Sequence, residues 1–156
     1  MGAVLSAILL GALALLLVSA GIEDVRKREI ANWKNAAIAL TAPLWWWSCG
    51  YALWPDVAIQ LALAAVVFGV FVIAFALGQM GGGDVKLIGA LALWLPFEPL
   101  ARMLIVMALA GGVLTLLLLA ERWWQRSKTV VEVPYGVAIV IAALIAFREP
   151  ILNRFG

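Results

Sequence analysis

The segment VAIQLALAAVVFGVFVIAFAL, residues 57–77, is an unbroken apolar run with one amide and no charge. A helix of about 20 such residues crosses the roughly 30 Å hydrocarbon core of a bilayer. The run therefore predicts a transmembrane helix. It stops at the glycine-rich segment GQMGGGDVKL, residues 78–87, which we expect to connect this helix to the next one.

The rest of the chain repeats this pattern. Of its 156 residues, 66% are hydrophobic and 13% are charged, and the mean hydropathy is +1.09, so polar side chains are too few to cover a soluble fold. The other apolar runs are continuous and not alternating, which argues against a membrane barrel; they occupy residues 3–22, 33–53, 84–95, 102–120 and 134–147. We predict an all-α integral membrane protein with about six transmembrane helices in a single domain, residues 1–156.

Basic residues are distributed unevenly between the loops. Eight of the eleven follow the first, third and fifth segments: Arg26, Lys27, Arg28, Lys34, Lys86, Arg122, Arg126 and Lys128. Because loops rich in Lys and Arg remain in the cytoplasm, these loops are predicted to be cytoplasmic and both termini external. No basic residue precedes the first segment, so we expect a retained helix and not a cleaved signal peptide.

Tryptophans gather near both ends of the predicted spans. This placement is typical of the aromatic belts at membrane interfaces, and it puts five tryptophans toward the outer side: Trp45, Trp46, Trp47, Trp54 and Trp94. Belt and packing roles are sufficient to explain them, without a ligand cage.

The fourth segment is unusually short. Pro96 and Pro99 limit the helix that starts at Asp84 to about 12 residues, or roughly 18 Å, which is too short to cross the core. Either the helix kinks through Pro96, or Asp84 lies below the membrane surface. In the second case the preceding glycines form irregular backbone at membrane depth, which is tolerated only inside protein or beside a wet cavity.

Two aspartates are predicted at the cytoplasmic ends of helices, Asp24 after the first and Asp84 at the start of the fourth. An ionisable group near the bilayer core is costly unless it is paired or hydrated, so each is a candidate functional residue. Two neighbouring carboxylates share one proton, which lets one take a proton from water while the other polarises a peptide carbonyl. Taken singly, Asp24 is equally a solvated acid balanced by Arg26 and Arg28, and Asp84 a helix N-terminal residue that favours the dipole.

The remaining composition excludes other chemistry. There is no histidine and only one cysteine, Cys49. This removes Ser-His and Cys-His machinery, the usual zinc-hydrolase ligands and an internal disulfide from the chain. We therefore expect no metal and no cofactor. The net charge of +2 gives no indication of nucleic-acid binding.

Three short motifs, taken together, are more specific. The segment from Asp24 to Asn32, then GGGDVKL at 81–87, then VPYGVA at 133–138 closely resemble, in this order and spacing, the type IV prepilin peptidases. The compact chain is similar to the small, peptidase-only form of tight-adherence (Flp) pilus systems. The resemblance implies a GxGD-type aspartic endopeptidase of the bacterial inner membrane, which cuts the basic leader from membrane-anchored prepilins or pseudopilins at the cytoplasmic face. The two catalytic aspartates of the family match Asp24 and Asp84.

Residues beside the second aspartate are candidates for supporting roles. Gly81, Gly82 and Gly83 form the predicted active-site loop, since glycine allows positive φ and a close approach of backbone. Lys86 either stabilises a carboxylate, binds substrate, or extends its ammonium group to the interface. Asn32 ends the first motif and is a further candidate.

The third motif supplies three more supporting candidates. Pro134 suits the first turn of the last helix, and Gly136 permits close packing. Tyr135 either forms a hydrogen bond near the site or anchors the helix at the interface.

The chain departs from the family at two places. Ala31 stands where members commonly have proline, which removes a rigid turn but no titrating group. The cysteine-rich cytoplasmic region of the larger, bifunctional members is missing, so we do not expect methyl transfer.

Two other interpretations remain. Presenilin-like and signal-peptide peptidases share the Gly-x-Gly-Asp element, but their first aspartate follows tyrosine, and here Glu23 precedes Asp24. A non-enzymatic scaffold or a small proton or cation transporter subunit would use the same aspartates to bind a proton or ion. That alternative predicts altered ion flux or assembly without proteolysis.

Overall fold

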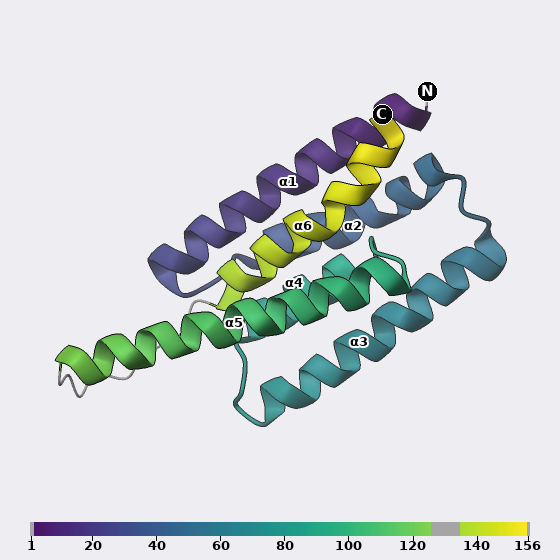
Figure 1. Cartoon of the computed structure of the whole chain (residues 1–156). Coiled ribbons are helices and arrows are strands. Elements are labelled where there is room, and N and C mark those ends of the chain that lie inside the picture. Colours follow the sequence, from purple (N-terminus) through teal and green to yellow (C-terminus); the bar gives the residue numbers. More distant parts are fainter. Residues whose placement is uncertain (1, 126–134, 156) are drawn as a thin grey trace.

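Helices make up nearly all of the computed structural model, which describes residues 2–125 and 135–155 (Figure 1). Its elements are α1 (Gly2–Lys27), α2 (Asn32–Cys49), the π-helical segment η1 (Leu53–Val57), α3 (Ala58–Ala76), α4 (Gly82–Ala92), α5 (Phe97–Gln125) and α6 (Tyr135–Phe155). The described residues contain no strand. The prediction of an all-α protein is confirmed, with six main helices among the described residues.

In the part of the chain that the structure describes, three helical stretches are long and apolar enough to cross a bilayer: Gly2–Lys27, Leu53–Ala76 and Phe97–Leu117. The apolar stretch Tyr135–Arg148 is shorter. Within α3 only Gln60 and Ala64 are buried in the protein, so its outer surface is almost entirely apolar and suits contact with lipid.

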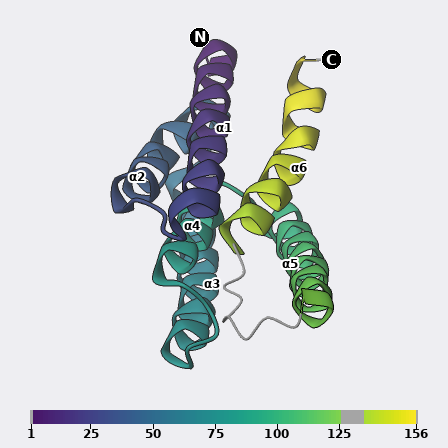
Figure 2. The same cartoon turned by 90° about the vertical axis from the view of Figure 1, so that its left-hand side faces the viewer.

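Both ends of the chain lie at one end of the bundle. In Figure 2, the start of α1 and the last turns of α6 are together at the top, and the connection between α3 and α4 is at the bottom.

Several helix boundaries differ from the sequence prediction. α2 ends at Cys49 and not at residue 53, because Gly50 adopts the left-handed conformation that terminates helices (φ 75°). α5 begins at Phe97 and not at residue 102, because Pro99 is compatible with the first turn of a helix.

The short helix α4 lies at the centre of the bundle. It packs against α2, α3 and α6, and its Leu87, Ile88 and Leu91 side chains are completely buried. Its 11 residues extend about 16 Å, roughly half the thickness of the hydrocarbon core. The predicted short fourth helix is therefore confirmed.

The start of α4 differs from the prediction. Gly82 and Gly83 belong to its first turn, and only Gly81 precedes it, with extended backbone (φ −72°, ψ 144°). Irregular backbone over all three glycines, one of the two alternatives for this region, is therefore not observed, and the positive-φ glycine here is Gly78. The close approach of backbone is observed at Gly83, where an added Cβ would lie 3.4 Å from Ile30.

The C-terminal end of α4 is held by side chains from two other helices. Gln60 Nε2, on α3, donates hydrogen bonds to the carbonyl oxygens of Ala92 (2.6 Å) and Leu95 (2.7 Å). Trp46 Nε1, on α2, donates to the carbonyl oxygen of Leu93 (2.7 Å). These bonds satisfy carbonyl groups that have no partner within the helix.

Three of the predicted interface tryptophans are core residues. Trp94 is 2% exposed, its ring stacks on Trp45 with centroids 5.4 Å apart, and its Nε1 donates to the carbonyl oxygen of Ile38 (2.8 Å). Trp45 and Trp46 are also buried, so their assignment to an outer belt is corrected. Each buried indole N–H of Trp46 and Trp94 has a backbone acceptor, so burying these rings leaves no indole donor without a hydrogen bond.

Candidate active site

Asp24 lies in the last full turn of α1 and faces the start of α6. Its side chain is 5% exposed, and the backbone N–H groups of Gly136 and Val137 approach its carboxylate. A Cβ at Gly136 would lie 2.8 Å from both Cγ and Oδ2 of Asp24. The predicted close packing at Gly136 is therefore observed, and its partner is the aspartate itself.

Asp84 lies in the first turn of α4 and is 9% exposed. The backbone of Gly81 lies beside its carboxylate, where an added Cβ would be 3.1 Å from Oδ2. A negative charge at this position is favoured by the helix dipole. The orientation of the side chain is thus fixed by the turn that precedes the helix.

The two carboxylates belong to one site. They come from different helices, 60 residues apart in sequence. Gly136, which lies against the Asp24 carboxylate, and Gly83, the residue before Asp84, both contact the side chain of Ile30. Asp24 Oδ2 is buried and has no hydrogen-bond partner among the described residues. The structure therefore brings together the pair that the sequence predicted, and it leaves one carboxylate oxygen free.

Ile30 fills the space between the elements that carry the pair. It lies in the connection from α1 to α2, is buried, and touches both Gly83 and Gly136, whose added Cβ atoms would lie 3.4 and 3.0 Å away. To reach this position the chain turns at Arg28, a non-glycine residue with φ of 58°. Backbone of this kind costs roughly 1 kcal/mol or more, so packing of Ile30 must offset it.

An ion pair fixes the end of α1 against the start of α2. Lys34 Nζ is 2.8 Å from Glu23 Oε2 and donates to the carbonyl oxygen of Ser19 (3.0 Å). Glu23 also accepts from the backbone N–H of Ala31 (3.3 Å). These bonds hold the connection that contains Ile30, and sequence reasoning did not anticipate them.

Two asparagines of α2 reach α4. Lys86 Nζ donates to Asn32 Oδ1 (2.8 Å), so two supporting candidates are partners, on the exposed side of α4. Asn35 Nδ2 donates to the carbonyl oxygen of Gly83 (3.2 Å), the residue before Asp84. Asn35 is buried, and its Oδ1 has no partner among the described residues.

Asn35 was missed in the sequence. The available signal was a polar residue at a helical spacing of three from Asn32, inside a predicted apolar span. Of the remaining candidates, Tyr135 begins α6 and packs against α5, where a Cβ at Gly111 would be 2.6 Å from its ring. Pro134 lies outside the described residues.

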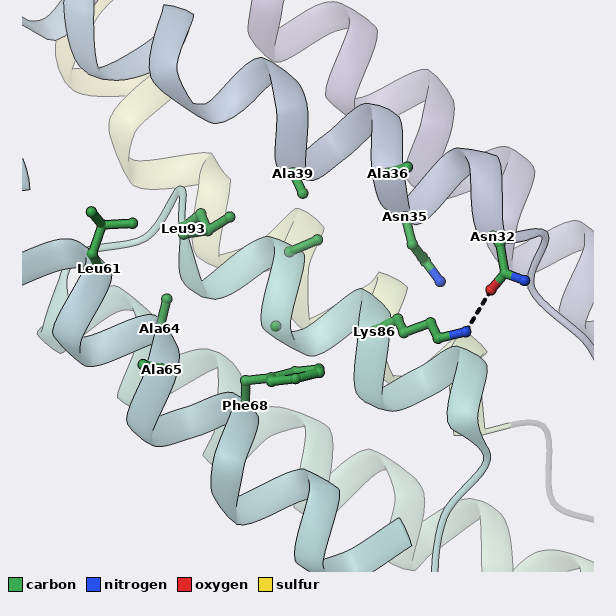
Figure 3. Close-up of a pocket in the computed structure, with 12 residues that line it drawn as sticks. Asn32, Asn35, Ala36, Ala39, Leu61, Ala64, Ala65, Phe68, Lys86 and Leu93 are labelled. Atoms are coloured by element: carbon green, nitrogen blue, oxygen red, sulfur yellow. Dashed lines mark hydrogen bonds between the residues drawn. The ribbon is translucent and has the colours of Figure 1, made fainter.

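An apolar groove of about 530 Å³ adjoins the site, between α2, α3 and α4 (Figure 3). Asn32, Asn35 and Lys86 line its polar end. Most other lining side chains are small or aliphatic, and Phe68 points from α3 toward α4. Asn35, at the polar end, is the lining residue that is bonded to the turn before Asp84.

This arrangement suits proton transfer between two acids. Side by side, two carboxylates hold a single shared proton over a range of pH, giving one base and one acid in the same site. Among the residues that the structure describes, no three His, Cys, Asp or Glu side chains converge. The pair alone supplies too few ligands for a complete metal site.

Comparison with known proteins identifies one family. A family model described as the type IV leader peptidase family matches residues 8–116 of the chain. The matched range contains both aspartates and the groove, and it ends before α6. No curated protein and no solved structure matches the chain.

Proposed function

We propose that this chain, which belongs to the type IV leader peptidase family, is an aspartic endopeptidase whose active groups are Asp24 and Asp84. Its substrates are precursors of type IV pilins or pseudopilins, and it removes their basic leader peptides. The bond lies where the leader joins the apolar helix that anchors the precursor in the membrane.

The observation that carries this proposal is the meeting of two buried aspartates from distant helices. Burial of carboxylates is costly, and a fold that brings two of them together needs a reason to do so. Structural ion pairing does not supply one, because neither aspartate forms an ion pair among the described residues, and Lys34 pairs with Glu23 instead. Catalysis by two acids that share one proton does supply a reason for burying them together.

The chemistry requires both acids. The ionised carboxylate removes a proton from water as the water oxygen attacks the peptide carbonyl carbon, and the protonated carboxyl group donates a hydrogen bond to the carbonyl oxygen. The proton then passes to the leaving nitrogen as the carbon–nitrogen bond breaks, which restores one shared proton. Asp24 Oδ2, with no partner among the described residues, is available to water or substrate.

Charge distribution supports a cytoplasmic site. The connection that follows Asp24 carries Arg26, Lys27 and Arg28, and Lys86 follows Asp84. The positive-inside rule therefore assigns this end of the bundle to the cytoplasm and both termini to the outside. A basic leader would be held there by the anionic inner leaflet.

The direct test is cleavage of a membrane-anchored precursor by the purified protein in liposomes. N-terminal sequencing and mass measurement of the product should show a single cut between leader and apolar helix and no added methyl group. Absence of a shortened product, with ion flux across the same liposomes, would favour the transporter interpretation instead.

Orientation is tested by cysteine labelling in a Cys49→Ser background. Glu29→Cys, beside the site, should react with an impermeant reagent only from the cytoplasmic side. Asp56→Cys, in the connection between α2 and α3, should react only from outside. The reverse labelling pattern would place the site on the outer face of the membrane and contradict the proposed orientation.

A further inference from the structure

We propose that the groove between α2, α3 and α4 binds the apolar helix of the membrane-anchored substrate, and that Asn35 Oδ1 accepts a hydrogen bond from the substrate backbone beside the bond that is cut. The inference rests on the proposed function and deepens it. It names the surface that receives the substrate and one residue that positions it.

The groove is linked to the turn before Asp84 through one of its lining side chains, Asn35. Asn35 lines its polar end and donates through Nδ2 to the carbonyl oxygen of Gly83, whose neighbour is Asp84. A chain that enters the groove and reaches Asn35 therefore contacts a side chain that is bonded to the residue before Asp84.

The groove has the lining that a helix needs. Small residues face it from all three helices: Ala36 and Ala39 on α2, Ala64 and Ala65 on α3, Gly89 and Ala90 on α4 (Figure 3). Small side chains let helix backbones approach closely, and van der Waals packing drives helix association in lipid. A lipid chain would also fill apolar space, but it offers no hydrogen-bond donor at the polar end.

Asn35 points to a peptide as the occupant. Its side chain is 5% exposed, and Oδ1 lacks a partner among the described residues although Nδ2 is bonded. Cleavage requires a helix to unwind near the cut, which frees backbone N–H groups that need acceptors at membrane depth. Oδ1 supplies such an acceptor beside Asp84.

The distribution of polar and apolar residues along the groove indicates how a substrate helix would lie in it. Lys86 Nζ and Asn32 lie at the exposed end of the groove, and the apolar lining extends toward Leu61 and Leu93 (Figure 3). A precursor helix with its polar N-terminal end near Lys86 and its apolar body along the groove matches this gradient. The leader then extends past the aspartates.

Photocrosslinking tests the position of the substrate. A benzophenone amino acid replaces Leu61, which lines the groove, or Ile59, which lies two residues away on α3 and outside it; both side chains are exposed, by 49% and 62%. In an Asp84→Asn background that retains substrate, crosslinking to the anchored precursor should be at least about fivefold stronger from 61 than from 59. Equal yields, or adducts with lipid only, would overturn the proposal.

Kinetics test the groove independently. Ala65→Leu fills exposed space in the groove, and Ala62→Leu makes the same change on α3 away from it. Ala65→Leu should raise KM for the anchored precursor about tenfold with little change in kcat, the pattern of lost binding, and Ala62→Leu should change neither. Unchanged KM in Ala65→Leu would contradict the assignment.

The role of Asn35 is tested with two replacements. Asn35→Leu should lower kcat/KM about tenfold, as expected for one lost hydrogen bond, and should also reduce the crosslink from position 61. Asn35→Gln, which retains the amide, should recover part of both. If Asn35→Leu lowered cleavage but left the crosslink intact, Asn35 would only hold the Gly83 turn, and its contact with substrate would be refuted.

These results separate the two proposals. Normal cleavage by Asp24→Asn or Asp84→Asn would refute the proposed function. Loss of cleavage in those variants with normal behaviour of Ala65→Leu and Asn35→Leu would leave the function standing and refute the groove alone.

Discussion

The two ends of α4 differ in how their polar groups are satisfied. At the C-terminal end, Gln60 and Trp46 donate hydrogen bonds to the carbonyl oxygens of Ala92, Leu93 and Leu95. The indole N–H of the neighbouring Trp94 also has a backbone acceptor. At the N-terminal end, Asp24 Oδ2 and Asn35 Oδ1 are buried without partners among the described residues. One end is saturated with hydrogen bonds, and the other retains free acceptors.

Within this helix of 11 residues, the C-terminal end contributes mainly to stability and the N-terminal end to the proposed chemistry. A buried polar group without a partner costs roughly 1–3 kcal/mol, so free acceptors are maintained only where a substrate or water will use them. The saturated end anchors α4 and thereby fixes the position of Asp84. The comparison predicts that variants at the two ends will have opposite effects on activity and on stability.

The largest effect is expected from removing either acid. Asp24→Asn, Asp84→Asn and the double variant should each lose at least about a thousandfold in kcat, because neither acid performs both proton transfers alone. The losses should be equal and not additive, since the pair acts as one unit. Rates of precursor cleavage at matched membrane abundance check this.

Stability should respond in the opposite sense. Each asparagine is near-isosteric and uncharged, so it is easier to bury than an ionised acid, and thermal unfolding should occur at the same or a higher temperature. A strongly lowered unfolding temperature would mean that the aspartates are structural.

A smaller loss is expected from crowding the free end. Gly136→Ala puts a Cβ 2.8 Å from the Asp24 carboxylate, so the carboxylate must move. Displacement of a reacting group by about 1 Å can cost around a hundredfold in rate. The matched control is Gly112→Ala, where an added Cβ meets nothing within 4 Å. Equal activity of the two variants would show that the position of Asp24 is not critical.

The sequence predicts the residues at the N-terminal end of α4 better than those at its C-terminal end. Asp24, Asp84 and Gly136 stand out because charged residues and glycines are rare in apolar spans and have few structural reasons to be there. The short fourth helix was likewise predictable from Pro96 and Pro99. Residues that are unfavourable in an apolar membrane helix can therefore be recognised from the sequence alone.

Helix orientation was not predictable in the same way. When every side of a helix is apolar, hydropathy identifies a span but not which residues face inward. Trp45 and Trp94 were therefore assigned to the interface although they are core residues. The helical first turn at Gly82 and Gly83 was missed for another reason, since glycine favours neither helix nor loop strongly enough to override packing against Ile30.

At the saturated end, the main effect should be on stability. Gln60→Leu leaves the carbonyl oxygens of Ala92 and Leu95 without their donor, at a cost of roughly 1–3 kcal/mol in the free energy of unfolding. Gln79→Leu is the matched control, because that amide is exposed just beyond α3. Thermal unfolding in detergent should show a lower midpoint for Gln60→Leu only. At temperatures where the variant stays folded, its kcat should equal that of the wild-type chain; a large loss of kcat would show that the two ends of α4 are not separable.

No effect is expected from removing metal ions, and this tests what the free acceptors at the N-terminal end are for. Asp24 Oδ2 and Asn35 Oδ1 are oxygen donors, so a bound cation is the alternative to water and substrate as their partner. Two carboxylates and an amide fall short of the six or more oxygens that Ca²⁺ takes, and no third acidic, histidine or cysteine side chain joins the pair among the described residues. Cleavage of the anchored precursor should therefore be unchanged, within about twofold, after dialysis against EDTA, and added Mg²⁺, Ca²⁺ or Zn²⁺ should not increase it. Activity that is lost on chelation and restored by one of these ions would assign the free acceptors to a cation, and the shared proton would no longer explain why both acids are needed.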